Sequence, residues 1–576
     1  MDFFKKQLRA VRGSVSLGLT LAMLNAGCDL FWPTIIATIV DDGILVGNAD
    51  HIRKMLIVMV CVGLFAAVVK YSKNCCAVIS GNRYARNTRR DLFEKVLSLP
   101  SGDVSRMGTA SLLTRCTNDI SAIGLTLDQF IRMMVRIPLT CIGGMILAFA
   151  LDWRMALIIL AVIPLIAWLS LRMLRSTMPK YGQLQNALDR FNRVLRERLW
   201  AVRVIRVFCK DAFEQDRLED ASGEMCDVST DVERRIGLIS PLMTMLVNLT
   251  ILLLVLYAAH MGLKGMVHIG ALISCIQYAN QILMAILQSA MLLSRLPRTA
   301  VSIRRIEDVM AHVPSVADEG VELPDAQADT LTFDHVSYRF PASHEDALHD
   351  VCFSIRKGET IAVIGSTGCG KSTLVNLAER FIDPTGGCIR LGETDITHIT
   401  QKELRKRLSV VPQQAFLFEG TIRDNLLYGD PHATEEEMLR ALDIAQATEF
   451  VLSFEEGLDH IVSSGGTNLS GGQRQRLSIA RALLRKPDFY LFDDSFSALD
   501  LKTDAAVRQG LKSAMGDAGY LIVAQRVSTI RHADRILVLD AGRVVGFDRH
   551  DALLHTCPVY RQIVQSQYEG GDADVD

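Results

Sequence analysis

A glycine-rich stretch in the second half of the chain has the residue types and spacing that bind phosphate. Its sequence, ETIAVIGSTGCGKSTLVNLAERF, passes from an apolar run through a loop into a helical pattern, and fits G-x-x-x-x-G-K-[ST] from Gly365 to Ser372. In such a loop, backbone N–H groups surround the phosphates, the lysine neutralises the β and γ oxygens, and the hydroxyl holds Mg²⁺. The expected nucleotide-binding residues are Gly365, Ser366, Thr367, Gly368, Cys369, Gly370, Lys371, Ser372 and Thr373.

Cys369 lies inside this loop, close to the N-terminus of the expected helix. A thiol in that position can be redox-sensitive, because the helix favours the thiolate. The alternative interpretation, which we favour, is that Cys369 is a small side chain that fills the loop.

A second apolar run, PDFYLFDD, predicts a buried strand that ends at Asp493. A carboxylate there is suited to hold Mg²⁺ through water. Apolar runs that end in aspartate are common, so this run indicates a Mg²⁺ site only in combination with the glycine loop. The residue after it, Asp494, stands where a general base for the attacking water is needed.

A third segment, NLSGGQRQRLSIARALL, begins a helix with Ser470, Gly471 and Gly472. The N–H groups at a helix N-terminus attract anions, so this turn could bind the γ-phosphate of a nucleotide.

The composition shows which elements must carry these segments. The chain has 576 residues, is 49% hydrophobic and has a formal net charge of −2, with a mean hydropathy of +0.23. The apolar excess lies before about residue 295, in runs near the ~20 residues that cross a bilayer. Thirteen cysteines without a CxxC suggest neither a zinc site nor a disulfide framework, and the near-neutral charge argues against nucleic acid as a partner.

The first half predicts six membrane spans. We expect them at about 14–40, 55–80, 126–150, 153–175, 236–262 and 267–295. A short amphipathic helix in MDFFKKQLRAVRG precedes them and should lie in the membrane interface. Arginines and lysines concentrate in the connections near 81–125 and 176–235, which places these connections and both termini in the cytoplasm. Helical periodicity continues through both connections, so the spans should extend beyond the membrane.

With these segments in place, the chain resembles an ATP-binding cassette (ABC) exporter half-transporter over nearly its whole length. The run LSGGQ at 469–473 is the most specific element of the resemblance. The resemblance implies an all-α six-helix transmembrane domain followed by an α/β P-loop nucleotide-binding domain. It also implies that two such chains enclose two ATP molecules, each between the glycine loop of one chain and the LSGGQ run of the other.

The resemblance assigns roles to further residues. Phe340 stands where an aromatic ring stacks on adenine, Gln413 where a glutamine senses Mg²⁺ and the membrane domain, and Asp500 where the two sites communicate. The expected Mg²⁺ ligands are therefore Ser372, Gln413 and Asp493. The segments 111–119 and 205–216 resemble the coupling helices of the family.

The chain departs from the family at the catalytic end of the site. Asp494 replaces the glutamate base, which withdraws the carboxylate by roughly 1–1.5 Å, and a misplacement of ~1 Å can cost about 10²-fold in rate. Gln525 replaces a histidine; its amide can donate a hydrogen bond but cannot shuttle a proton. Ser464 replaces a glutamate that usually precedes the LSGGQ run.

These departures resemble the degenerate chain of a heterodimeric exporter. Its own site would bind ATP and hydrolyse it slowly, while its LSGGQ run would complete the hydrolytic site of a partner that supplies glutamate and histidine. The alternatives are a homodimer with a slow aspartate base, an importer of a metal chelate with the exporter fold, and a non-hydrolysing regulatory subunit.

Charged and amide side chains inside the spans raise the question of a substrate. Lys70, Lys73, Arg132 and Arg136 could line a cavity that attracts an anionic or amphipathic compound, or could pair within the bundle. Gln277, Gln281 and Gln288 share one helical face, which should meet the cavity or the partner. The resemblance favours a drug, lipid or peptide as the transported compound.

The expected organisation is a transmembrane domain at 1–311, a polar linker at 312–330, a nucleotide-binding domain at 331–568 and an acidic tail at 569–576. The protein is expected in the cytoplasmic membrane.

Overall fold

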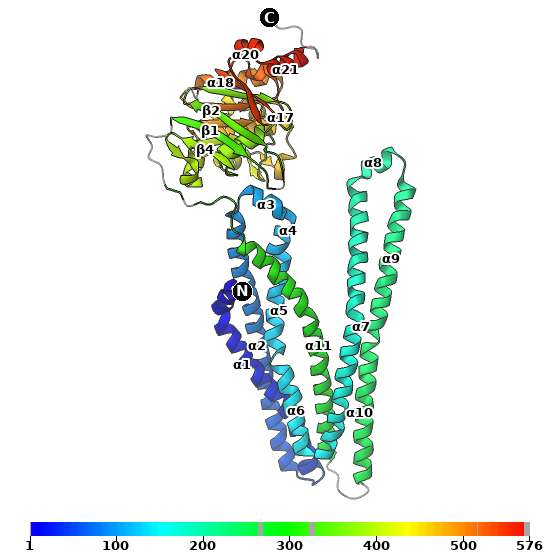
Figure 1. Ribbon diagram of the computed structural model, residues 1–576. Helices are drawn as coiled ribbons and strands as arrows, with labels where there is room; N and C mark the ends of the chain where they lie inside the picture. Colours follow the sequence, from blue (N-terminus) through cyan, green and yellow to red (C-terminus); the bar gives the residue numbers. More distant parts are fainter. Residues whose placement is uncertain are drawn as a thin grey trace. The chain divides into compact units, whose positions relative to one another are not determined.

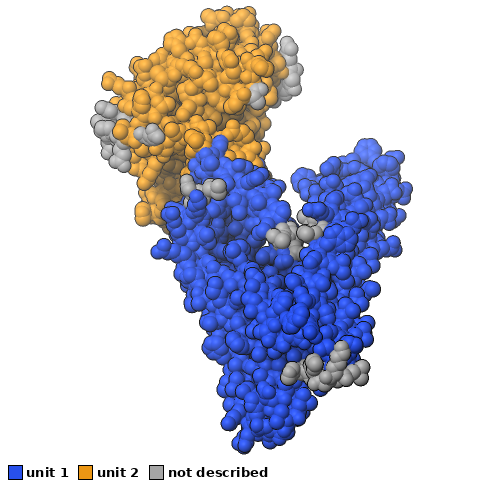
Figure 2. Space-filling view, turned by 60° about the horizontal axis from the view of Figure 1, so that its bottom comes forward, with its two compact units in different colours: residues 1–97, 108–312 blue, residues 98–107, 313–576 orange. Residues whose placement is uncertain are grey.

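The computed structural model describes residues 2–262, 269–318, 320–321, 329–341, 343–514 and 517–568. The chain divides into two compact units, 1–97 with 108–312 and 98–107 with 313–576 (Figure 2). The predicted acidic tail and the residues 319 and 322–328 of the predicted linker lie outside the described residues.

The first unit is entirely helical in its described part (Figure 1). Its helices are α1 (Asp2–Thr38), α2 (Ala49–Leu97), α4 (Thr109–Thr114), α5 (Ile120–Met133), α6 (Arg136–Leu151), α7 (Trp153–Trp200), α8 (Val202–Val207), α9 (Asp211–Gly237), α10 (Ile239–Gly262) and α11 (Ile269–Ala311), with π-helical turns η1 (Ile39–Ile44) and η2 (Arg115–Asp119).

Six apolar segments occur where the six spans are predicted. Within the described residues, five helical segments are long and apolar enough to cross a membrane: Phe3–Ile44, Ala49–Leu97, Thr109–Leu151, Asp211–Met261 and Ile269–Ser289. The place of the fourth predicted span is taken by a shorter apolar segment, Trp153–Leu169, within α7. The apolar helical segments therefore occur in the order along the chain that the sequence predicts for membrane spans.

The predicted interfacial helix at the N-terminus is not a separate element. Helix α1 continues from Asp2 to Thr38, so the amphipathic segment and the first span share one backbone. MDFFKKQLRAVRG contains no proline, and its isolated Gly13 is tolerated within a helical pattern, which explains why the helix does not stop there.

The long connections are helical, as their periodicity predicts. Helix α2 runs for 49 residues and α7 for 48, well beyond the length that a bilayer requires. Residues 111–119, expected to form a coupling helix, lie in α4 and η2 of the first unit. The part of this connection that groups with the second unit is earlier in the chain, at 98–107, and contains α3 (Ser101–Met107). The second expected coupling segment, 205–216, lies in α8 and the start of α9.

Small residues allow close helix packing in the first unit. A Cβ on Gly81 of α2 would lie 2.6 Å from the carbonyl oxygen of Gly124 on α5, and one on Gly124 would lie 3.0 Å from that of Gly81. Such contacts are typical of membrane helices, where close backbone approach stabilises association.

In its described residues, the second unit contains three sheets. The larger mixed sheet has the order β12-β11-β3-β10-β9-β6, an antiparallel sheet has the order β2-β1-β4-β5, and β7 pairs with β8. The strands are β1 (Thr330–Tyr338), β2 (Leu348–Arg356), β3 (Thr360–Gly365), β4 (Gly386–Leu391), β5 (Thr394–Asp395), β6 (Leu408–Val411), β7 (Gly420–Thr421), β8 (Ile461–Val462), β9 (Phe489–Asp493), β10 (Gly519–Val523), β11 (Arg535–Asp540) and β12 (Arg543–Asp548).

Helices surround these sheets. They are α12 (Lys371–Ala378), α13 (Gln401–Arg407), α14 (Ile422–Leu427), α15 (Glu435–Ile444), α16 (Thr448–Leu452), α17 (Gly471–Leu483), α18 (Leu501–Ala514), α19 (Val527–Ile530), α20 (His550–Thr556) and α21 (Pro558–Tyr568). The central strands are buried on both faces, as in β3, where Ile361–Ile364 is at most 1% exposed. This burial explains why β3 and β9 read as unbroken apolar runs in the sequence.

The order of the parallel strands positions the site. Strands β6, β9, β10 and β3 are successive neighbours and run parallel, with Val523 of β10 opposite both Asp493 and Val363. Their carboxyl ends therefore meet at one edge of the sheet, where ligands bind in open α/β sheets.

Candidate nucleotide-binding site and membrane cavity

Four strand ends bring the predicted nucleotide site together. Gly365 ends β3, Asp493 ends β9, and Gln413 and Gln525 follow the ends of β6 and β10 by two residues each. The four segments are far apart in the sequence, and the parallel pairing of the sheet makes them neighbours.

The glycine loop connects β3 to α12. Gly368 and Gly370 have φ values of +84° and +102°, which side chains with a Cβ rarely adopt, so these two positions require glycine. Lys371 begins α12, and its Nζ donates to the carbonyl oxygens of Gly365 and Ser366 at 2.8 and 2.7 Å. The ammonium group is thus held directly under the loop, where a phosphate would be neutralised.

Cys369 is 3% exposed and belongs to the apolar core beneath the antiparallel sheet. Burial raises the pKa of its thiol, which opposes formation of a reactive thiolate. These observations favour the loop-filling interpretation over a redox role.

The expected Mg²⁺ ligands Ser372 and Asp493 are adjacent, and Ser372 Oγ donates to Asp493 Oδ1 at 3.2 Å. Burial raises the pKa of Asp493, and the charge of Asp494 raises it further. A divalent cation beside these oxygens would offset the cost of burying the charge. The donor set, one hydroxyl and one carboxylate under a lysine, therefore fits ATP with Mg²⁺.

Asp494 has contacts that the sequence did not predict. Its Oδ2 accepts hydrogen bonds from Nε2 of Gln413 at 3.2 Å and from Nε2 of Gln525 at 2.7 Å. The residue is 6% exposed and has a φ of +48°. Burial raises the pKa of Asp494, while the amide of Gln413, the charge of Lys371 and the amide of Gln525 oppose that rise.

The two glutamines share one oxygen of Asp494, and their expected roles toward Mg²⁺ and the γ-phosphate stay predictions. Gln413 was expected to contact Mg²⁺, and Gln525 to stand near a γ-phosphate, but in this structure both amides are directed to Asp494. No described residue hydrogen-bonds to Oδ1 of Asp494, so Oδ1 is the oxygen left to meet a water molecule.

The LSGGQ turn is open to solvent and well formed. Ser470 caps α17: its Oγ accepts from the backbone N of Gln473 at 3.2 Å, while Gln473 Oε1 accepts from the backbone N of Ser470 at 2.8 Å. This capping box fixes the first turn of the helix. No heavy atom outside its neighbours lies within 4 Å of a Cβ built on Gly471. The start of α17 is therefore accessible from solvent.

Phe340 and Asp500 are two further residues that the sequence assigns to the site. Phe340 is 47% exposed, and its ring makes an edge contact with Tyr338 at a centroid distance of 5.0 Å, so one face is open for a base. Asp500 precedes α18 and accepts from the backbone N and hydroxyl of Thr503 at 2.9 and 2.7 Å. These hydrogen bonds lower the pKa of Asp500.

The membrane unit contains a polar cavity of about 450 Å³. Its polar lining includes Lys70 of α2, Arg136 of α6, and Gln281 and Gln288 of α11. Asp29 of α1 also lines it, lies 3.5 Å from Arg136 in an ion pair, and was not singled out from the sequence. The rule that marks cations inside spans would have found Asp29, because a lone carboxylate in a span is equally costly.

The other two cations are paired within the bundle. Lys73 Nζ donates to Asn25 Oδ1 at 2.8 Å, and Arg132 Nε donates to Asp128 Oδ1 at 2.9 Å. Gln277 is not among the residues that line the cavity. Lys70 and Arg136 therefore line the cavity, whereas Lys73 and Arg132 are paired within the helix bundle.

The sequence matches two described families. Residues 15–286 match the ABC transporter transmembrane region, and residues 348–497 match the ABC transporter domain. An uncharacterized ABC transporter ATP-binding protein of Mycobacterium tuberculosis is 33% identical over 572 residues, 98% of this chain and 98% of that protein. An ATP-dependent lipid A-core flippase of Syntrophus aciditrophicus is 27% identical over 574 residues, 99% of this chain and 95% of that protein.

A solved structure has the same fold. A bacterial Atm1-family ABC exporter with ATP bound superposes with a TM-score of 0.79, at 23% sequence identity, over 97% of this chain and 99% of that chain. The match covers residues of both units.

Proposed function

This chain belongs to the ABC transporter family as a half-transporter that couples ATP hydrolysis to transport through a membrane, and we propose that it is the slowly hydrolysing chain of a heterodimer. In this proposal the glycine loop of the chain, with Phe340, binds ATP, while Ser372, Asp493 and Gln413 serve Mg²⁺. The turn from Ser470 to Gly472 completes the site on the partner.

The pair of amides on Asp494 is the observation that carries the proposal. Gln413 and Gln525 both donate to Oδ2, so this oxygen is occupied and the position of the carboxylate is fixed. The aspartate side chain is also one methylene shorter than glutamate, so its carboxylate reaches less far toward the water. Burial raises the pKa of Asp494 despite the two hydrogen bonds, but a higher pKa does not lengthen the side chain.

The LSGGQ turn supports a division of labour between two chains. Ser470 is capped, and the space around Gly471 is open. A chain whose only role was to hold ATP would not need this turn, because the turn serves the nucleotide of the other chain. Asp500, beside the N-terminus of α18, would link the two sites, as the family resemblance implies.

The cavity suggests the class of the transported compound. Lys70 and Arg136 carry two positive charges against one negative charge on Asp29, and the amides of Gln281 and Gln288 add donors and acceptors. The remaining lining includes Trp32, Met284 and Ile137, which are apolar. We propose a small amphipathic compound or lipid with an anionic group. The similarity to a lipid A-core flippase is consistent with this class.

ATPase measurements on the purified chain test the heterodimer. The full-length chain purified alone in lipid nanodiscs should bind ATP and hydrolyse it slowly, whereas the same chain purified with a co-expressed half-transporter that carries glutamate and histidine should hydrolyse it rapidly. Fast hydrolysis by the chain alone would contradict the heterodimer and favour a homodimer with an aspartate base. Transport in oriented vesicles then separates export from import.

A further inference from the structure

The segment that follows the last membrane helix is held at two points within the second unit. Helix α11 ends at Ala311, and the second unit begins one residue after His312. Asp103 Oδ2 accepts from the backbone N of Ser315 at 2.8 Å, and Arg380 Nη2 donates to the carbonyl oxygen of Ala317 at 2.7 Å. These bonds fix a stretch of chain that the sequence predicts to be a simple polar linker.

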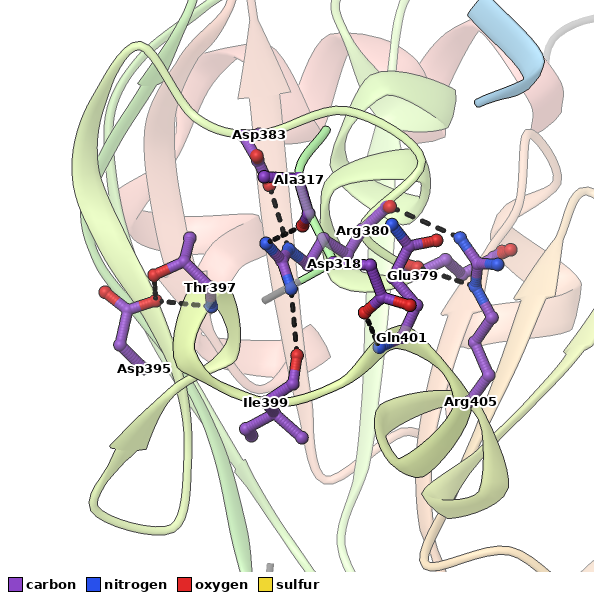
Figure 3. Close-up of polar contacts among 10 residues, drawn as sticks. All are labelled: Ala317, Asp318, Glu379, Arg380, Asp383, Asp395, Thr397, Ile399, Gln401 and Arg405. Carbon is purple, nitrogen blue, oxygen red and sulfur yellow. Dashed lines mark hydrogen bonds and ion pairs between the residues drawn. The ribbon is translucent and has the colours of Figure 1, made fainter. Parts of the chain in front are cut away.

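Arg380 is the central residue of this arrangement (Figure 3). It is 2% exposed and lies two residues beyond the end of α12. Besides Ala317, its guanidinium donates to the carbonyl oxygen of Ile399 at 2.8 Å and to Asp383 Oδ1 at 3.1 Å. A buried guanidinium satisfied by three separate segments is a rigid joint, and lysine could not replace its planar set of donors.

The linker is fastened a second time just after Ala317. Asp318 Oδ1 accepts from the backbone N of Gln401 at 2.7 Å, as Figure 3 shows. Val321 then pairs with the chain near Ile399: its N donates to the carbonyl oxygen of His398 at 2.8 Å. The linker therefore lies along the segment 398–401 that Arg380 also holds.

The hydrogen bond from Ser315 is accepted by a residue of the connection between the second and third spans. Asp103 of α3 is 3% exposed and forms an ion pair with Arg106 at 3.2 Å. Helix α3 lies in the chain between α2 and α4, which belong to the membrane unit. Two membrane-derived segments, α3 and the end of the α11 connection, thus meet at Ser315.

From these contacts we infer that Arg380 is a positioning residue that couples the nucleotide site to the membrane helices through residues 315–318. Helix α12 begins at Lys371, the residue expected to bind phosphate, and continues for eight residues as a rigid rod of roughly 12 Å. A shift of the glycine loop on ATP binding is carried by α12 to Arg380 and from there to Ala317. Ala317 follows the end of α11 by only six residues, so the segment between Arg380's partner Ala317 and the membrane helix is short.

The chain contains its own reporter for a test. Its four tryptophans, Trp32, Trp153, Trp168 and Trp200, all belong to the membrane unit, and Trp32 lines the cavity. In the full-length protein with its co-purified partner in nanodiscs, ATP with Mg²⁺ should change tryptophan emission and its quenching by acrylamide. Any tryptophans of the partner contribute equally to wild type and variants.

Arg380→Ala should remove most of this response while the Kd for ATP stays close to that of wild type, and its Tm should fall because Asp383 and two carbonyl oxygens lose their donor. Arg380→Lys should also lose it, because lysine cannot bridge three acceptors in a plane. The matched control is Arg390→Ala: Arg390 is a half-exposed arginine of the same unit, paired with Asp334 at 3.1 Å, and its loss should leave the response intact.

Asp318→Ala provides a second variant if Arg380→Ala does not fold, because Asp318 is exposed and its loss removes the hydrogen bond to Gln401 and the charge attraction to Arg405. We expect a partial loss of the response. The inference is overturned if the tryptophans of wild type do not respond to ATP, or if both Arg380 variants and Asp318→Ala respond like wild type. It is also overturned if the response falls only in proportion to ATP affinity, which would indicate a purely structural tie.

Discussion

The glycine-loop site and the LSGGQ turn of this chain differ in what each retains. The glycine-loop site keeps the groups for binding, namely Lys371, Ser372 and Asp493, but its catalytic end carries Asp494 under two amides. The LSGGQ turn keeps its complete sequence, an intact capping box and open space at Gly471. Binding and hydrolysis can therefore be separated, because a change of the single residue that follows β9 alters the base position while Asp493, Lys371 and Ser372 are retained.

The largest effect is expected from Gly471→Asp. The open space around Gly471 accommodates a side chain within this unit, so the variant should fold. Its carboxylate would repel the γ-phosphate held by the partner, and loss of one such stabilising group typically costs about 100-fold or more in rate. ATPase activity of the purified pair should fall by about that factor, as measured by phosphate release.

Gly465 provides a control for Gly471→Asp. It also has open space around it, although its φ of +72° makes any substitution strained, so Gly465→Asn is the milder comparison. This control should retain most of the activity of the pair. Retention of full activity by Gly471→Asp would show that the LSGGQ turn does not serve catalysis.

The next effect is a gain of activity at the glycine-loop site. In the Gly471→Asp background, which silences the partner site, Asp494→Glu together with Gln525→His should raise the remaining ATPase activity by about tenfold. Glutamate extends the carboxylate, and histidine restores a group that can transfer a proton. Gln525→His alone is the control and should have a smaller effect. An unchanged rate in the double variant would mean that these two residues are not what limits hydrolysis.

The sequence predicted the parts of both regions that depend on local patterns. The loop, the strand that ends at Asp493 and the helix that begins after Ser470 each follow from residue types within a short window. The bond between Gln525 and Asp494 could not be predicted in that way, because it joins residues 31 positions apart through the order of β9 and β10 and through side-chain rotamers. No single sequence encodes strand order as a visible pattern.

The membrane half shows the same limit. Apolar runs predicted the spans, and persistent periodicity predicted the long helices α2 and α7. The grouping of 98–107 with the second unit and the ion pair of Asp29 with Arg136 depend on contacts across the fold, and the sequence did not reveal them.

A smaller effect is expected for the pH dependence of the stability of the nucleotide unit, through Glu379, the residue after α12. Glu379 follows α12 and is 7% exposed; burial raises its pKa to about 8, the charge of Asp493 acts in the same direction, and Arg405 opposes. The folded protein therefore keeps a proton that the unfolded chain releases, so this group favours the folded state below the unfolded pKa of 4.5. That contribution is lost as the pH rises through about 8.

Glu379→Gln should remove this pH dependence, because glutamine has the shape of the neutral acid. Between about pH 5 and about pH 8, the Tm of the wild-type nucleotide unit should fall by a few degrees more than that of the variant. The measurement is a thermal unfolding series without nucleotide, followed by the β-sheet band of the infrared spectrum, because the described strands all lie in the second unit. Glu345→Gln, at an exposed position, is the matched control. Parallel pH profiles for wild type and Glu379→Gln would show that Glu379 is ionised in the folded protein.

The smallest effect on ATPase activity is expected from Asp494→Asn. A small effect would show that the glycine-loop site contributes little to hydrolysis, in contrast to the LSGGQ turn. In a chain whose aspartate is a working base, removal of the charge should cost about 10²-fold or more in ATPase rate. In the heterodimer the partner site carries the turnover, so the rate of the pair should change by less than about twofold. The comparison variant is Asp493→Asn, which removes an expected Mg²⁺ ligand and should weaken ATP binding at the glycine loop while Asp494→Asn leaves it intact. If Asp494→Asn abolishes the activity of the pair, the glycine-loop site itself hydrolyses ATP. The short aspartate would then reach the water through Oδ1 despite the amides on Oδ2. The glycine-loop site would in that case be a slower catalytic site rather than an inactive one.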